Sequence, residues 1–394
     1  MSAMQAIHIT SVSLRSISGR LGESLVVTIG IACVVFVLVM TLALSSSLAD
    51  AIATTGHPDR ALVLRNGSVV ESLSSVSRED AARLRSLPGI ARQRDGEVAV
   101  SPEVLVNVML EDVDGLALVR GLTATGFELR PEIRVVEGRT ITEGRHELTV
   151  GRLAQRSTPS LAIGRYLQVG GVDWQIVGAF ESGGDAHESE LLADGPTLMA
   201  AVGRNELSSA TVQLLSADHF GQFHSAVAAI RGANLKVERE SDYYRGQAET
   251  MSRLSYVVAY VVGAIMAFGA TCGALNMTYS TVDARTVEVA TLRAIGFGAL
   301  PITVAILVES TLLAVIGAVA GALLAWVFVD GNTFAATQYL GIGVSVNHLT
   351  LRLTVAAEHM VVGVVWACGI GLIGALLPAV RATNRSIARG LQTV

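Results

Sequence analysis

The sequence contains long stretches of apolar residues that carry no charge. Three of them are long enough to cross a membrane, at residues 24–49, 254–282 and 359–380. A fourth covers 310–329 and extends backwards, through Glu309, to Pro301. A helix needs about 20 apolar residues to span the roughly 30 Å hydrocarbon core of a bilayer. We therefore predict a membrane protein with four transmembrane helices, the third of them at 301–329.

Most charged residues lie between the first two predicted helices. Of the chain's 29 Lys and Arg and 34 Asp and Glu residues, 49 fall within 50–253. These are 28 acidic and 21 basic residues, so the segment has a net negative charge. It therefore lacks the positive charge that proteins use to bind nucleic acid. We predict that 50–253 is a soluble domain inserted between the first two helices, in a one-plus-three arrangement of transmembrane helices.

The first apolar stretch resembles a signal peptide at its end, where Ser47-Leu48-Ala49 is similar to a cleavage site. Its 26 uncharged residues far exceed the roughly 7–15 residues of a signal-peptide core. We interpret it as an uncleaved anchor.

Arginines near the ends of the predicted helices indicate the orientation. Seven of them lie in the segments 1–23, 283–300 and 381–394, which share one side if the four helices are threaded in order. The opposite short loop, 330–358, contains only Arg352. By the positive-inside rule both termini are cytoplasmic, and the inserted domain is extracytoplasmic.

The second predicted helix is longer than a bilayer requires. Its 29 uncharged residues would span about 43 Å at about 1.5 Å per residue. The preceding segment, 238–253, is amphipathic, with Tyr244, Ala248, Met251 and Leu254 at helical spacing. We predict that one helix continues out of the membrane as a stalk to the soluble domain.

The inserted segment mixes helical and strand patterns. Ser77 is a predicted helix N-cap, and the helix ends before Pro88-Gly89. A hairpin is predicted where apolar and polar residues alternate over 172–176 after the Gly170-Gly171 turn. Further strands are expected at 61–65, 98–100, 105–110, 147–150, 210–215 and 235–238, and a helix at 218–230. We therefore predict a mixed α/β extracytoplasmic domain.

The sequence contains none of the catalytic motifs that we sought. Its single lysine, Lys236, does not follow a glycine, so no P-loop can form around it. Two His-Glu pairs, at 146–147 and 187–188, begin like a zinc-protease motif, but the fifth position of each lacks the second histidine. We predict that the chain is not an enzyme, binds no metal and carries no cofactor.

The segment 181–194 gathers five acidic residues around His187. It lacks the alternation of ligands that a calcium-binding loop needs. We interpret it as a solvated acidic tip of the inserted domain.

The short cytoplasmic loop 283–300 carries a helical pattern. Residues 285–295 can form one helix with Val289, Leu292 and Ile295 on one face, after which Gly296 breaks it. A short helix held between two membrane spans is either a docking surface or an interfacial connector without a partner. Both interpretations stay open on the residues alone.

The same loop contains Arg285-Thr286-Val-Glu288 followed by Leu292-Arg-Ala-Ile-Gly296, and the next predicted helix contains Glu309-Ser310. These motifs resemble the signature of MacB-type ABC permeases, whose relatives include FtsX and the LolC/LolE lipoprotein-release subunits. Residues 137–139, 147–151 and 172–180 are similar to the family's extracytoplasmic core domain, and 374–381 to its C-terminal motif. The resemblance spans nearly the whole chain.

The resemblance implies a dimeric permease of a bacterial cytoplasmic (inner) membrane. Its loop helix would seat in a cleft of a separate cytoplasmic ATPase, which binds the ATP and Mg, and a periplasmic adaptor (membrane-fusion protein) is a further candidate partner. The implied function is export, or extraction from the outer leaflet, of a hydrophobic or amphipathic substrate, as in efflux or lipoprotein release. The implied coupling residues are Arg285, Thr286, Glu288, Leu292, Arg293, Ala294, Ile295 and Gly296.

The chain departs from the family's pattern in two places. Asp283-Ala284 stands where many relatives have Val-x-Glu, and the tail at 386–392 lacks the usual proline. Pairing with a divergent second permease therefore stays an alternative to a homodimer.

Two features of the predicted helices bear on assembly. Glu309 is an acidic residue within a span, and we interpret it as a structural contact near the cytoplasmic interface. Gly269 with Gly273, and Gly317 with Gly321, allow close approach of helices. Packing within the chain and dimerisation both fit, and the resemblance favours Gly269 and Gly273 for the dimer.

Two other functions remain alternatives. The first is an FtsX-like transducer that regulates an extracytoplasmic enzyme instead of moving a solute. The second, from another class, is a membrane sensor or scaffold, which would need a cytoplasmic output domain. The predicted cytoplasmic ends, 1–23 and 381–394, are too short to form one.

Overall fold

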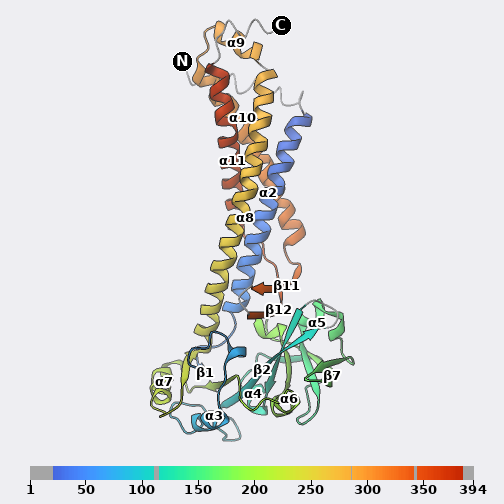
Figure 1. Cartoon of the computed structure of the whole chain (residues 1–394), viewed down its shortest axis with the longest axis vertical. Helices are drawn as coiled ribbons and strands as arrows, with labels where there is room; N and C mark the ends of the chain where they lie inside the picture. The colour runs from blue at the N-terminus through green and yellow to red at the C-terminus, as the bar shows by residue number, and fades with distance from the viewer. Residues whose placement is uncertain (1–20, 111–114, 285, 341–343, 385–394) are drawn as a thin grey trace. The chain divides into compact units, whose positions relative to one another are not determined.

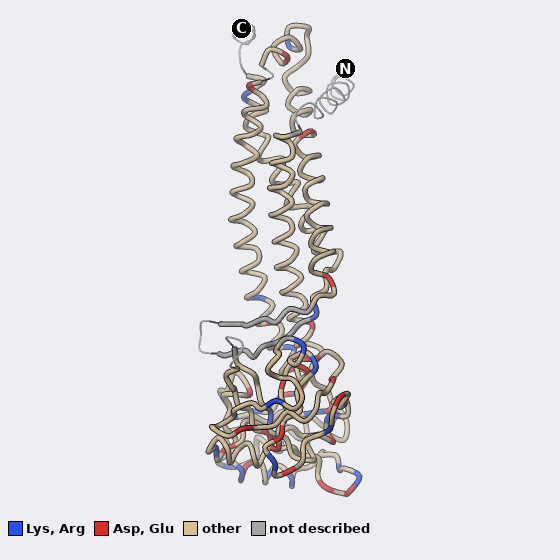
Figure 2. Tube along the Cα trace, turned by 90° about the vertical axis from the view of Figure 1, so that its right-hand side faces the viewer, with Lys and Arg blue, Asp and Glu red and all other residues tan. Residues whose placement is uncertain are grey.

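The computed structural model describes residues 21–110, 115–284, 286–340 and 344–384. The chain divides into two compact units. The membrane unit falls within Met1–Ser46, Arg253–Asn332 and Leu353–Val394. The outer unit comprises Ser47–Ser252 and Thr333–Arg352. Charged residues gather in the outer unit and are scarce along the long helices (Figure 2).

Among the described residues, four helices are long and apolar enough to cross a membrane (Figure 1). They are α2 (Leu21–Ala53), α8 (Glu240–Ala284), α10 (Ala299–Val329) and α11 (Ala357–Asn384). The prediction of four spans is confirmed. Helix α8 has 45 residues, a length of about 68 Å at about 1.5 Å per residue. It includes residues 240–253 of the amphipathic segment that the sequence places before the second span, whereas residues 238 and 239 belong to a strand.

Small residues bring the helices of the membrane unit into close contact. A Cβ on Gly317 would lie 2.7 Å from the carbonyl oxygen of Thr28, and one on Gly321 would clash with the carbonyl of Ala32. Alanines of α10 and valines of α2 form the core around this crossing, with Ile31 buried at its centre. The second of the two glycine motifs therefore serves packing of α10 against α2 within one chain.

The outer unit is built on a mixed sheet of ten strands, in the order β10-β1-β9-β2-β3-β8-β5-β7-β4, with β6 paired to β7. Most pairs are antiparallel, while β3–β8 and β5–β7 are parallel. The strands are β1 (Arg60–Arg65), β2 (Val100–Leu110), β3 (Gly115–Leu122), β4 (Arg134–Gly138), β5 (Glu147–Gly151), β6 (Tyr166–Val169), β7 (Val172–Glu181), β8 (Leu191–Asp194), β9 (Ser209–Gln213) and β10 (Leu235–Arg239).

Short helices connect these strands and cover the sheet (Figure 1). They are α3 (Arg78–Leu84), α4 (Ala124–Glu128), α5 (Arg152–Ser157), α6 (Gly195–Ala201), α7 (Phe220–Ala228), η2 (Glu71–Leu73), η3 (Pro159–Leu161), η4 (Ala186–Ser189) and η5 (Ala217–His219). One apolar core surrounds Trp174 and Leu198, and another surrounds Leu84 and Phe223. The predicted mixed α/β domain is confirmed.

Local sequence signals place several of these elements. Ser77 caps α3, because its hydroxyl accepts the Asp80 N–H at 3.0 Å. Gly170 and Gly171 have φ of +62° and +78°, the left-handed conformation of a type I′ hairpin turn between β6 and β7. Trp174 alternates inward on β7 and is fully buried. Each of these features was predicted.

Other elements differ from the sequence-based expectation. The strand expected at 105–110 is longer and begins at Val100, as β2, whereas residues 98 and 99 lie outside it. Strands β3, β4 and β8 were not predicted. The loop expected at 330–358 contains two paired strands, β11 (Thr333–Leu340) and β12 (Val344–Arg352), which belong to the outer unit.

Candidate functional site

The predicted coupling loop contains a short helix, α9 (Thr286–Ala294), between the end of α8 and the start of α10. Arg285 lies outside the described residues. Gly296 has a φ of +104°, which glycine adopts at little cost because it has no Cβ. Pro301 lies in the first turn of α10, where its missing N–H leaves no helical hydrogen bond unmade.

One face of α9 packs on the membrane unit. Ala290 is 5% exposed, and Val289 and Phe297 pack against Ile302 and Ala305 at the start of α10. The hydroxyl of Thr286 donates to the backbone of the preceding turn. The helix is therefore seated at one end of α10 by apolar contacts.

The other face of α9 is open. Val287 is 42% exposed and Ile295 is 72% exposed. Glu288 and Ala294 are also exposed, whereas Arg293 is half-buried. The sequence placed Val289 and Ile295 on one face, but Val289 packs on α10 while Ile295 is exposed. Two residues that are six positions apart on a helix lie about a third of a turn away from each other.

Glu309 and Ser310 lie in the first half of α10. Glu309 is half-buried, about 15 Å along the helix from Ala299. The Ser310 hydroxyl donates to the Gly371 carbonyl of α11 at 3.1 Å. This position therefore belongs to the α10–α11 contact.

The two glycine motifs have different surroundings. A Cβ on Gly269 or Gly273 would meet no atom within 4 Å, and both residues are exposed on α8. By contrast, Gly317 and Gly321 are in close contact with α2. Within the described part of the chain, only the Gly317 and Gly321 motif is used in packing.

A second notable site, which the sequence did not reveal, is a buried group of charged residues in the outer unit. We call it the ionic cluster. Its side chains come from the start of β1, η2, β2, β3, the turn before β4, the end of α4, the loop before β8 and the start of α8. Its members are Arg60, Glu71, Glu103, Arg120, Arg130, Glu132, His187, Glu190 and Glu240.

Arg120 is the centre of the ionic cluster. Its guanidinium contacts Glu71 at 2.9 Å, Glu103 at 2.7 Å and Glu190 at 2.6 Å. Arg130 holds the other side of Glu103 at 2.8 Å. These side chains are almost fully buried, so each charge is compensated inside the protein instead of by water.

The protonation states follow from burial and pairing. Burial alone would raise the pKa of Glu103, but Arg130 and Arg120 outweigh it and lower that pKa to about 2. Glu190 is likewise held ionised, with a pKa far below its usual range, because Arg120 outweighs burial. Burial opposes protonation of His187, yet Glu190, 3.3 Å away, raises its pKa above the usual value.

The ionic cluster also fixes the start of α8. Glu240, the first residue of that helix, lies 3.3 Å from Arg60 and accepts the His57 N–H at 3.0 Å. Three residues later, the Tyr243 hydroxyl accepts the backbone N–H of Glu71 at 2.8 Å. Within the outer unit, the first turn of α8 is therefore bound to the sheet by charged groups.

The end of α2 reaches the same region. Gly56, just after α2, has a φ of +87°, and a Cβ there would lie 2.9 Å from the backbone of Glu240. The hydroxyl of Thr55 accepts the Ala186 N–H at 2.9 Å. The segment that follows α2 and the first residue of α8 are thus packed side by side.

The interpretation of 181–194 as a solvated acidic tip is wrong. Asp185, His187, Glu188, Glu190 and Asp194 are each at most 9% exposed. Arg120 neutralises Glu190, and the carboxylates of the others accept backbone N–H groups, as Glu188 does from residues 182 and 184. Among the described residues, no group of three or more His, Cys, Asp and Glu side chains is placed to hold a metal ion.

Comparison with known families agrees with this architecture. A model of the MacB-like periplasmic core domain matches residues 24–231, and a model of the FtsX-like permease C-terminal matches residues 260–387. The chain belongs to the MacB/FtsX-type ABC permeases. Permeases of this kind work with a cytoplasmic ABC ATPase. The predicted family and fold class are therefore confirmed.

Individual relatives are distant from this permease. It is 25% identical over 234 residues to the macrolide export ATP-binding/permease protein MacB of Hyphomonas neptunium. That match covers 57% of this chain and 34% of the relative, so the chain spans about a third of the relative's length.

Two solved structures are similar to part of this chain. One is the extracellular domain of YknZ, a noncanonic ABC-type transporter from Gram-positive bacteria, with 18% identity and a TM-score of 0.34 over 45% of this chain and 99% of that one. The other is the periplasmic region of MacB from Actinobacillus actinomycetemcomitans, with 14% identity and a TM-score of 0.36 over 48% of this chain and 92% of that one.

Proposed function

We propose that this chain is the transmembrane subunit of a MacB-type transporter that couples ATP hydrolysis by a separate cytoplasmic ATPase to export or extraction of a hydrophobic or amphipathic substrate. ATP and Mg bind to the ATPase, and this chain contributes no catalytic group. The observation that carries the proposal is α9, a helix seated on α10 by Val289 and exposed at Val287, with the exposed Ile295 directly after it.

The exposed part of α9 is suited to docking. It offers apolar side chains beside charged ones, the composition found where two proteins meet. The proposed contact surface comprises the predicted coupling residues Arg285, Thr286, Glu288, Leu292, Arg293, Ala294, Ile295 and Gly296.

Transmission to the outer unit would run through α8. The helix is continuous from Glu240, which the ionic cluster holds, to Ala284, which precedes α9. Motion of the loop would therefore act on a helix that is bound by buried ion pairs at its other end. In this proposal the membrane is the bacterial cytoplasmic membrane, with both termini cytoplasmic and the outer unit outside.

A second permease copy, or a divergent paralogue, would complete the transporter. The exposed Gly269 and Gly273 on α8 provide a surface where another helix can approach closely. A periplasmic adaptor remains a further proposed partner of the outer unit.

The coupling proposal is tested with Ile295→Asp in the chain reconstituted with its ATPase. A charge at this exposed position should weaken docking and reduce the permease-dependent ATPase activity at least tenfold, about 1.4 kcal/mol of lost interaction. Ile295→Leu is the matched control and should retain activity. Unchanged stimulation by Ile295→Asp, with the fold intact, would refute docking at this surface.

Regulation of an extracytoplasmic enzyme is the second candidate function. The match of 260–387 to the FtsX-like permease C-terminal favours it as much as it favours transport. The two functions differ in what the reconstituted complex does. Transport predicts ATP-dependent loss of an amphipathic probe from the vesicle membrane, whereas a purely regulatory permease would hydrolyse ATP without moving the probe.

A further inference from the structure

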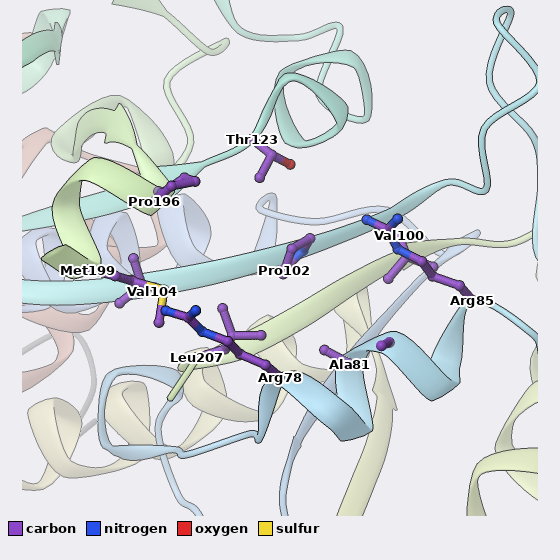
Figure 3. Close-up of a pocket in the computed structure, with 12 residues that line it drawn as sticks. Arg78, Ala81, Arg85, Val100, Pro102, Val104, Thr123, Pro196, Met199 and Leu207 are labelled. Atoms are coloured by element: carbon purple, nitrogen blue, oxygen red, sulfur yellow. The ribbon is translucent and has the colours of Figure 1, made fainter. Parts of the chain in front are cut away.

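The outer unit contains a cavity of about 430 Å³ between α3, β2 and α6 (Figure 3). This volume is within the range of about 300–1,000 Å³ that is usual for small-molecule sites. Its walls are formed by Arg78, Ala81, Ala82, Arg85, Val100, Pro102, Val104, Thr123, Gly195, Pro196, Met199 and Leu207. None of the predicted coupling residues that the structure describes lines it.

The floor of the cavity is apolar. Val100 and Val104 project from β2, Met199 from α6, and Leu207 from the segment before β9, and all four are buried. A cavity surface of methyl and thioether groups favours a ligand with an apolar chain, since burying that chain removes both surfaces from water.

The open side of the cavity is positively charged. Arg78 is the first residue of α3, and Arg85 directly follows its last residue. Because seven residues are close to two helical turns, the two arginines lie on the same face. Ala81 and Ala82 lie between them and leave room because their side chains are small. Figure 3 shows both arginine side chains extending from α3 toward β2. Arg78 and Arg85 are the charged residues among those that line the cavity, so its charge is positive.

The other arginine of α3 has a different environment. Arg83 contacts Glu79 at 2.5 Å and Asp80 at 3.5 Å, and it does not line the cavity. By contrast, among the residues that the structure describes, neither Arg78 nor Arg85 has a side-chain hydrogen bond or ion pair. The helix thus compensates one arginine and leaves the two at the cavity available to an anion.

We propose that this cavity binds an amphipathic anion, with its apolar chain along the floor and its acidic group held by Arg78 or Arg85. A guanidinium binds carboxylate or phosphate through charge-assisted hydrogen bonds, and the apolar floor accounts for the chain. The inference rests on the proposed function, because it assigns the amphipathic substrate of that transporter a site on the outer unit.

The test is calorimetric titration of the full chain in lipid nanodiscs with octanoate, octanol and octyltrimethylammonium. The three probes share a chain and differ in charge, and empty nanodiscs give the background from partition into lipid. Octanoate should bind saturably, at least tenfold more tightly than octanol, and the cationic probe should show no saturable binding.

Variants locate the site. Arg78→Ala and Arg85→Ala together should weaken octanoate binding at least tenfold, the loss expected for a charged hydrogen bond. Arg83→Ala, on the same helix but outside the cavity, is the matched control and should leave binding unchanged. Met199→Trp should block binding by filling the floor, with thermal unfolding used to check that each variant is folded.

Three results would overturn the proposal: no saturable binding of octanoate, equal binding of octanol and octanoate, or octanoate binding that survives loss of both arginines. The titration contains no ATPase. Failure of the ligand site and failure of the coupling proposal are therefore separate results.

Discussion

Arg120 contacts three carboxylates in a site from which water is almost excluded. The ionic cluster as a whole has five glutamates against three arginines, and His187 adds a fourth positive charge when it is protonated. Such a group contributes little net stability compared with apolar packing. Removing one partner is costly, however, because the remaining charges stay buried without compensation.

Arg120→Met should therefore destabilise the outer unit by about 3–5 kcal/mol. The measurement is urea unfolding followed by the fluorescence of Trp174, after Trp326 and Trp366 of the membrane helices are replaced by Phe. Arg83→Met removes an exposed pair and should change stability by less than about 1 kcal/mol. A loss below about 1 kcal/mol for Arg120→Met would show that the cluster is not tightly compensated.

Glu103 gives the outer unit a specific sensitivity to acid. Its pKa of about 2 in the folded protein is below the ordinary value of 4.5, so its pairing stabilises the fold above pH 4.5 and is lost as pH falls toward 2. The loss is about 3 kcal/mol at about 1.36 kcal/mol per pKa unit. In Glu103→Gln, the free energy of unfolding should change less between pH 4.5 and 2 than in the wild-type protein. An unchanged slope would show that Glu103 is not the source of the acid sensitivity.

His187 acts in the opposite direction. Its folded pKa is raised, so its contribution is fully present below the unfolded value of about 6.5 and is lost as pH rises through the folded pKa. The wild-type outer unit should therefore lose stability as pH rises above about 6.5, and His187→Gln should not show this loss. The same fluorescence measurement checks this, and a decrease that persists in the variant would assign it to another group.

At the scale of elements, the contact of α10 with α2 depends on glycine. Gly317 and Gly321 let the backbones approach so closely that a larger side chain cannot fit, whereas Gly269 and Gly273 on α8 have open space. The same type of motif therefore serves two different surfaces.

Gly321→Leu should destabilise the membrane unit by at least about 1–3 kcal/mol, the usual cost of overpacking. Gly269→Leu should leave the fold of one chain intact and weaken only association of two chains. Thermal unfolding in detergent measures the first effect, and light scattering of the detergent complex measures the second. If Gly269→Leu unfolded the single chain, the proposed exposure of this face would be wrong.

The elements that the sequence predicts are those governed by local pattern. Span length, the Ser77 cap, and the Gly170-Gly171 turn depend only on neighbouring residues. The ionic cluster was missed because its pairs join distant segments, such as Arg120 and Glu190, which are 70 residues apart. The acidic segment 181–194 was misread for the same reason, since its neutralising partner is on β3. A buried arginine in an otherwise apolar strand was the one local signal of the cluster.

At the scale of the whole molecule, α8 connects the two units along the chain. It begins at Glu240, inside the ionic cluster, and ends at Ala284, before α9. A flexible Gly-Ser-Gly-Ser insertion after Ser252 should leave ATPase binding unchanged and abolish substrate movement. An insertion of the same length into the exposed Arg231-Gly232 turn is the control. Normal transport by the Ser252 insertion would exclude α8 as the transmitting element.

The central claim is that α9 docks on a cytoplasmic ATPase, and photo-crosslinking from position 295 tests it most directly. Ile295 is 72% exposed, so a photoreactive residue placed there can reach a partner without disturbing the fold. In the native host, we predict a crosslinked product that mass spectrometry identifies as an ABC ATPase with its P-loop. Crosslinks only to lipid, or to proteins without a nucleotide-binding domain, would contradict the account.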